Sequence, residues 1–130
     1  AEQNNVNAQC RLGYIYDIGP EMERNDKEAF YWYQKSAKQG HSFAQHRLAF
    51  IYQYGRGVKK DDKKAFYWNR KSAEQGDTHA QSRLGWMYSV GRGVEQSGVH
   101  AFHWWSKSAE QGNGYAQEKI KGILSRLGNL

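Results

Sequence analysis

The sequence predicts an all-α solenoid built from 36-residue helix-turn-helix repeats. A shift of 36 residues aligns the chain with itself without a gap. Residues 8–43 match residues 44–79 at 18 of 36 positions, and residues 44–79 match residues 80–115 equally well. Small and apolar residues recur within each repeat at helical spacing. A repeat of this size is one supersecondary unit that buries its core only by stacking on its neighbours.

The 130 residues divide into one array with a partial unit at either end. We expect complete repeats at residues 8–43, 44–79 and 80–115, and the first helix of a fourth, capping unit at residues 116–130. Residues 1–7 read as the end of a preceding repeat, because Ala-Glu-Gln at positions 1–3 recurs at positions 73–75 and 109–111. We therefore expect a piece cut from a longer array, with proteolytic processing as the alternative.

The first helix of each repeat is predicted near residues 8–18, 44–54 and 80–90. Ala8, Leu12 and Tyr16 illustrate its fixed apolar positions, which lie at i, i+4 and i+8 on one helix face. A Ser or Thr followed three residues later by Gln, at Ser42 and Thr78, fits a capping box at the helix start.

The second helix is predicted near residues 26–39, 62–75 and 99–111. Asn25 is a candidate N-cap for the first of them. A glycine stands one residue past each helix, where a left-handed C-cap favours it, at Gly40, Gly76 and Gly112. Fixed small residues predict close helix contacts. We expect the recurring tryptophans to fill the space between repeats, at Trp32, Trp68 and Trp104.

Gly-Arg-Gly-Val connects the two helices in the second and third repeats, at residues 55–58 and 91–94. Two glycines around one residue predict a tight turn, after which the valine folds back onto the helix pair. The first repeat has Gly-Pro-Glu-Met at residues 19–22 instead, so its loop must turn differently.

These residues resemble a known family. The pattern Ala-Gln-x-x-Leu-Gly-x-x-Tyr, Gly-Arg-Gly-Val, Lys-Ala-Phe-x-Trp and Lys-Ser-Ala-Glu-Gln-Gly is similar to the Sel-one-like repeat (SLR), a relative of the tetratricopeptide repeat. The resemblance spans the chain and implies a right-handed α/α superhelix. It also implies a non-catalytic scaffold or adaptor that binds proteins, including inhibitor or immunity-type roles in some bacterial relatives.

Function must come from positions that the fold does not dictate, and in a repeat these are the positions that differ between units. One first-helix position is aromatic but changes ring, at Tyr14, Phe50 and Trp86. By analogy with tetratricopeptide repeats, this face lines the concave groove, and the three rings form a row along it. We expect a partner to bind there through the row and its polar neighbours, which are Asp17, His46, Gln53, His79, Ser82 and Ser89. Packing between neighbouring helices is an equally good explanation of the rings.

No catalytic, metal or cofactor site is predicted. Cys10 is the single cysteine, which excludes an intramolecular disulfide, and it has no recurring His or Asn companion. Some cysteine-rich relatives are linked to β-lactamase activity, so a hydrolase of that type stays an alternative. Their paired cysteines are absent here.

The formal net charge of +6 favours an acidic protein or peptide partner. Nucleic acid or another anionic surface is the alternative, although Asp61 and Asp62 interrupt the basic cluster near the second loop. The recurring Arg11, Arg47 and Arg83 indicate a structural role such as ion pairs between repeats. No apolar window is long enough for a membrane span.

The apolar residues near the C-terminus, Ile120, Ile123, Leu124 and Leu127, predict some end-to-end self-association. The compartment stays open between exported or periplasmic and cytoplasmic.

Overall fold

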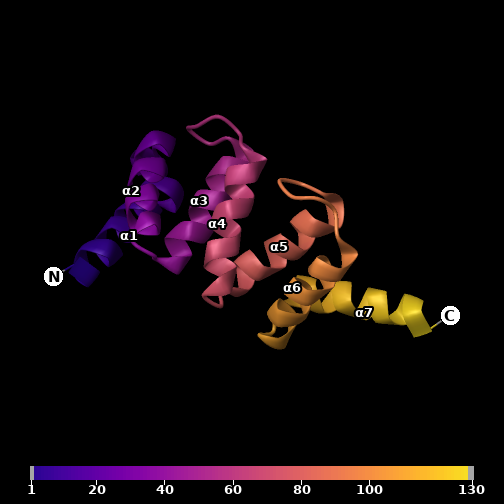
Figure 1. Cartoon of the computed structure of the whole chain (residues 1–130). Helices are drawn as coiled ribbons and strands as arrows, with labels where there is room; N and C mark the ends of the chain where they lie inside the picture. The colour runs from indigo at the N-terminus through magenta and orange to yellow at the C-terminus, as the bar shows by residue number, and fades with distance from the viewer. Residues whose placement is uncertain (1, 129–130) are drawn as a thin grey trace.

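The computed structural model describes residues 2–128, which form seven α-helices, one 3₁₀-helix and no strand. The elements are α1 (Glu2–Ile18), η1 (Glu21–Glu23), α2 (Asp26–Lys38), α3 (Ser42–Tyr54), α4 (Asp62–Glu74), α5 (Thr78–Val90), α6 (Gly98–Glu110) and α7 (Gly114–Gly128). Each helix packs against the next, and the two ends of the chain lie at opposite ends of the array (Figure 1). The predicted all-α solenoid of helical pairs is confirmed.

The second helices end as the sequence predicts. Gly40, Gly76 and Gly112 have φ angles of +93°, +99° and +92°. At the first of these ends, the Gly40 amide donates to the carbonyl of Ala37, and the His41 amide donates to the carbonyl of Ser36. This pair of bonds is the Schellman motif, which satisfies carbonyls that the helix leaves free.

The helix starts agree with the sequence only in part. Asn25 caps α2 as predicted, because its side chain accepts from the Glu28 amide at 3.1 Å. The predicted capping boxes are wrong: the side chains that cap α3 and α5 belong to His41 and Asp77. Ser42 and Thr78 are already helical, and their hydroxyls hydrogen-bond to the helix that follows, Ser42 to Ser72 of α4 and Thr78 to Ser108 of α6. In the third repeat, the second helix (α6) begins one residue before the predicted Val99, and Ser97 is its N-cap.

The tryptophan prediction is confirmed in part: Trp68 and Trp104 pack against the core clusters, and Trp104 contacts the cluster that joins α4 to α5 of the next repeat. Trp32, Trp68 and Trp104 are only half-buried, and the fully buried position is the next one along each second helix. Tyr33, Asn69 and Trp105 occupy it, with exposures of 0%, 3% and 5%. The two large rings lie against glycines of the first helix, Gly13 and Gly85. In the middle repeat, Ala49 takes the place of the glycine and the smaller Asn69 takes the place of the ring.

The loops confirm the predicted difference between repeats. Gly55 caps α3 with φ +67°, Gly57 has φ +78°, and Val58 packs on the core. A Cβ on Gly57 would lie 2.9 Å from the backbone of Asp26 in the preceding repeat, so this loop also sets the distance between repeats. In the first repeat, residues 21–23 form η1 instead, and Met22 is exposed.

Candidate functional site: a groove along the first helices

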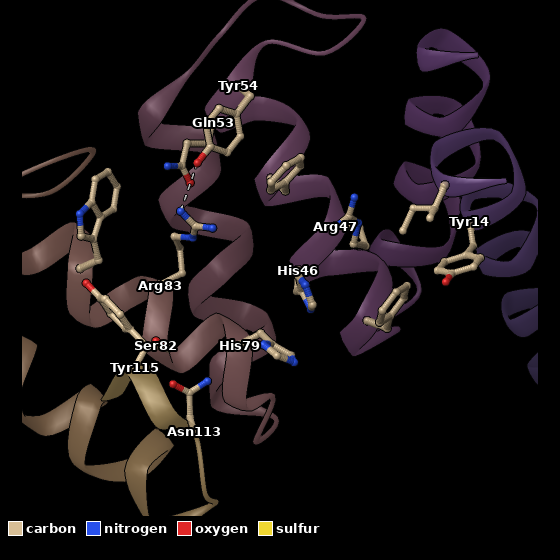
Figure 2. Close-up of a pocket in the computed structure, with 14 residues that line it drawn as sticks. Tyr14, His46, Arg47, Gln53, Tyr54, His79, Ser82, Arg83, Asn113 and Tyr115 are labelled. Carbon is tan, nitrogen blue, oxygen red and sulfur yellow. Dashed lines mark hydrogen bonds between the residues drawn. The ribbon is translucent and has the colours of Figure 1, made fainter. Parts of the chain in front are cut away.

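An open groove of about 830 Å³ runs along the first helices of all four units (Figure 2). Its walls come from α1, α3, α5 and α7, together with the Asn113 cap of α7. The lining residues are Tyr14, Ile18, Phe43, His46, Arg47, Phe50, Gln53, Tyr54, His79, Ser82, Arg83, Trp86, Asn113 and Tyr115. The groove crosses three repeat boundaries because every first helix contributes the same face.

Seven of the nine residues predicted for this face line the groove: Tyr14, His46, Phe50, Gln53, His79, Ser82 and Trp86. Asp17 and Ser89 do not. Asp17 is 3% exposed and is held inside the fold by ion pairs. The Ser89 hydroxyl donates to the carbonyl of Trp86 at 2.8 Å. Both side chains therefore bind other groups of the protein itself, and neither is placed to contact a partner in the groove.

The aromatic residues of the groove pack differently from the expected row. The Tyr14 ring lies 6.0 Å from that of Phe43, and the Phe50 ring lies 4.6 Å from that of Tyr54. Trp86 is half-buried beside an arginine three residues earlier on its own helix. Each ring of the predicted set thus packs with other neighbours, and half of the Tyr14 and Tyr54 surface stays exposed.

Two of the recurring arginines, for which the sequence predicts a structural role, also line the groove. The Arg47 guanidinium lies 4.6 Å from the centre of the Phe50 ring, and that of Arg83 lies 5.9 Å from the Trp86 ring. Such contacts are typical cation–π geometries. The spacing that could have revealed them is present in the sequence, because an arginine precedes the variable aromatic residue by three positions in each repeat.

Asp17 is the centre of a buried ion cluster between the first two repeats. Its Oδ2 accepts from the Arg47 Nε at 2.9 Å and from the Tyr33 hydroxyl at 3.0 Å. Its Oδ1 lies 3.3 Å from an Nη1 of Arg56. Burial and the negative charge of Asp17 raise the pKa of Tyr33, which therefore stays protonated and donates. For Arg47, the predicted ion pair between repeats is present.

Two histidines and an aspartate lie at the edge of the groove where α3 meets α5. His46 Nδ1 is 3.3 Å from Asp77 Oδ2, and the His46 and His79 rings are 5.6 Å apart. Burial acts to raise the pKa of Asp77. Hydrogen bonds from His46 and from the Ala80 amide, with the charges of both histidines, outweigh burial and lower that pKa overall. Asp77 therefore carries the negative charge that orients His46.

The groove shows no assembled catalytic or metal site among residues 2–128. No cluster of three or more His, Cys, Asp or Glu side chains there is placed to hold a metal ion. Neither groove histidine forms a hydrogen bond with a Ser or Cys side chain in the part of the chain that the structure describes, so the groove itself pairs no such nucleophile with a histidine base. Outside the groove, the Ser97 hydroxyl lies 2.8 Å from Nδ1 of His100. Cys10 is buried, and burial raises the pKa of its thiol to about 11.

Stacked helical pairs with a continuous groove along their first helices define the protein as an α-solenoid. The Sel1 repeat profile matches residues 6–41, 42–77 and 78–113. The chain therefore belongs to the Sel1 repeat family. The profile has the same 36-residue period as the sequence alignment, with each unit beginning two residues earlier.

Solved structures of the same fold agree with this assignment. The chain is 37% identical to c5321, a protective antigen of uropathogenic Escherichia coli strains with an SLR fold, with a TM-score of 0.90. The match covers 97% of this chain but 27% of that one, so this chain spans about a quarter of its length. A Sel1 repeat protein from Oxalobacter formigenes is also 37% identical, with a TM-score of 0.83 over 93% and 91% of the two chains.

Helicobacter pylori cysteine rich protein B has the same fold at 24% identity, with a TM-score of 0.75 over 91% of this chain and 90% of that one. No match was found among curated proteins. Sel1 repeat proteins are generally non-catalytic scaffolds for protein interactions. Within residues 2–128, no helix is both long enough and apolar enough to cross a membrane.

Proposed function

We propose that this protein binds an extended segment of a partner protein in the groove along its first helices. The observation that carries the proposal is the coincidence of two features. The groove is continuous over four first helices, and all of its lining residues except Arg47 and Arg83 occupy positions that differ between repeats. Most residues that pack the repeats recur from unit to unit, apart from the position of Tyr33, Asn69 and Trp105, whereas residues that recognise an irregular partner need not recur.

The partner we propose is acidic. None of the fourteen lining residues, all within the described range, is Asp or Glu, and four of them are Arg or His. The whole chain carries a formal charge of +6. Complementary charge speeds association and selects among partners more than it adds affinity. The exposed rings of Tyr14, Tyr54 and Tyr115 supply the apolar area that a bound segment would cover.

The experiment is partner capture from the source lysate by the wild-type protein and by a variant with Tyr14, Phe50 and Trp86 all changed to Ala. We expect the triple variant to lose the captured partner while its far-ultraviolet circular dichroism keeps a helical spectrum. A matched control changes three exposed aromatic residues of the second helices, Tyr31, Tyr67 and Phe102, and should keep the partner. Capture that survives the groove variant, or that is lost only in the control, would refute the groove assignment.

A finer form of the proposal is that binding inhibits the partner, as an immunity-type protein does. Its test is the activity of the captured partner with and without a stoichiometric amount of this protein. Inhibition by the wild type and not by the groove variant would support it. A partner whose activity does not change would leave a scaffold or adaptor role.

A further inference from the structure

We infer that Arg83 forms a subsite for the carboxylate of an acidic side chain in the bound segment. This inference rests on the proposed function and adds to it a position and a chemical group. It follows from a difference between the two equivalent junctions of the array.

At the first junction, an internal carboxylate neutralises the groove arginine. Asp17 lies between Arg47 and Arg56, at 2.6 Å and 3.3 Å from their nitrogens, and is almost completely buried. Arg47 lines the groove with its charge already paired. A second carboxylate from a ligand would have to compete with this short, buried ion pair.

At the second junction, the same three positions are Gln53, Arg83 and Arg92. The neutral amide replaces the carboxylate, so Arg83 keeps its cation–π contact but loses its counterion. Among residues 5–128, whose side chains the structure describes, no carboxylate lies within ion-pair distance of Arg83. Its hydrogen bond is a long one of 3.5 Å, donated to the Tyr54 hydroxyl. Arg92, the equivalent of Arg56, lies instead 3.7 Å from Asp62.

At the second junction, Gln53 also has a polar atom without a hydrogen-bond partner among the described residues. Its side chain lines the groove, the residue is 3% exposed, and its Oε1 is buried with no hydrogen-bond partner in the described part of the chain. A buried polar atom left unpaired is unfavourable. Figure 2 shows Gln53 and Tyr54 on one side of the groove, with the Arg83 side chain directed toward them. The three side chains provide a guanidinium, an amide and a hydroxyl at one place.

These groups suit a carboxylate. A guanidinium donates two parallel hydrogen bonds to the two carboxylate oxygens, and such charge-assisted bonds are stronger than neutral ones. The Tyr54 phenol can donate to a remaining lone pair, whereas the unpaired Gln53 Oε1 is an acceptor and suits a backbone N–H of the same segment. The groove continues past Arg83 toward α1 on one side and toward Asn113 and Tyr115 on the other. A side-chain carboxylate therefore fits better than a chain end, because the segment can pass through in both directions.

The same geometry sets the register of the segment. The half of the groove near α1 offers Tyr14, Ile18 and Phe43, whereas the unpaired positive charge lies at the α3–α5 junction. We therefore place an apolar residue of the partner over α1 and its acidic residue at Arg83.

The test is a nuclear magnetic resonance titration that follows the side-chain Nε–Hε signals of the arginines. The probe is the blocked peptide acetyl-Phe-Gly-Glu-amide, with the neutral acetyl-Phe-Gly-Gln-amide as its matched control. At constant ionic strength, we expect a saturable shift of the Arg83 signal, with a dissociation constant in the millimolar range for so small a ligand. The signals of Arg47 and of Arg70, which pairs with Glu74 on the surface, should not saturate.

Two variants change which junction contains an internal carboxylate. Gln53→Asp supplies the internal carboxylate that the first junction already has, so it should abolish the shift of Arg83 without unfolding the protein. Asp17→Asn removes the carboxylate from the first junction, so Arg47 should become the responsive arginine. If Asp17→Asn does not fold, Gln53→Asp decides the question alone.

The inference fails if Arg83 shows no saturable shift, or if Gln53→Asp still gives the wild-type shift. It also fails if the unblocked acetyl-Phe-Gly-Gln acid or inorganic phosphate saturates Arg83 while the Glu peptide does not, because the site would then serve a chain end or a phosphate. The proposed function fails separately, if the aromatic triple variant still captures its partner. Loss of capture in that variant with no response at Arg83 would leave the groove as the binding site and remove only the carboxylate subsite.

Discussion

Gly85 of α5 lies directly against the indole of Trp105, and we predict that Gly85→Ala destabilises the protein although alanine is the better helix former. An added Cβ would overlap Cδ1 and Nε1 of the indole and would lie 2.7 Å from its Cγ. Trp105 is 5% exposed, and its Nε1 donates to the carbonyl of Ser82 at 3.2 Å. The ring cannot move away without breaking this bond or disturbing the core around it.

Forcing one extra methyl group into a packed core costs about 1–3 kcal/mol. Loss of the indole hydrogen bond adds about 1 kcal/mol. The higher helix propensity of alanine returns about 1 kcal/mol. The expected net loss is therefore about 1–3 kcal/mol in the free energy of unfolding, or a fall of several degrees in Tm for a domain of this size.

The assay is urea denaturation followed by circular dichroism. Gly122→Ala in α7 is the matched control, because a Cβ there meets open space and the change should stabilise by about 0.5–1 kcal/mol. The middle repeat already carries the compatible pair, with Ala49 and Asn69 in place of glycine and tryptophan. A Gly85→Ala variant as stable as the wild type, beside a stabilised control, would refute the packing argument.

Three further predictions concern charge, reactivity and assembly. Asp77→Asn keeps the helix cap, as Asn113 does for α7, but removes the charge. Because the folded pKa of Asp77 is lowered, its stabilisation is present above the unfolded pKa and is lost as the pH falls through the folded value. Urea denaturation should therefore show a steeper loss of stability below about pH 4 in the wild type than in the variant, and equal slopes would contradict the ion pair. Cys10 has a pKa of about 11, raised by burial, so a thiol reagent at mildly alkaline pH should label it much more slowly in the native than in the unfolded protein; equal rates would mean that the thiol is accessible. Leu124 and Leu127 are 53% and 57% exposed, so we propose self-association through α7, to be measured by sedimentation and weakened by Glu at both positions; a monomer at every concentration would contradict it.

The groove shows where reasoning from the sequence succeeds and where it stops. Comparing the repeats identified Tyr14, Phe50 and Trp86 as one variable face, and the structure places all three along the groove. The same comparison grouped Asp17 with Gln53, but it could not show that the carboxylate is buried by two arginines. Equivalent positions share a place in the helix, whereas their exposure depends on which side chains the next repeat brings against them.

Helix packing likewise depends partly on local sequence and partly on tertiary contacts. The sequence alone determined the repeat, its period, the two helices of each unit and the glycines that end the second helix, because these follow from local backbone preferences and from helical periodicity. Which ring fills the core, Trp32 or its neighbour Tyr33, was decided by the tertiary structure, because it is Tyr33 that lies against Gly13 of the first helix and is fully buried. Whether Arg83 is paired was likewise decided there, because an ion pair depends on distances between helices that the order of residues in the chain does not contain.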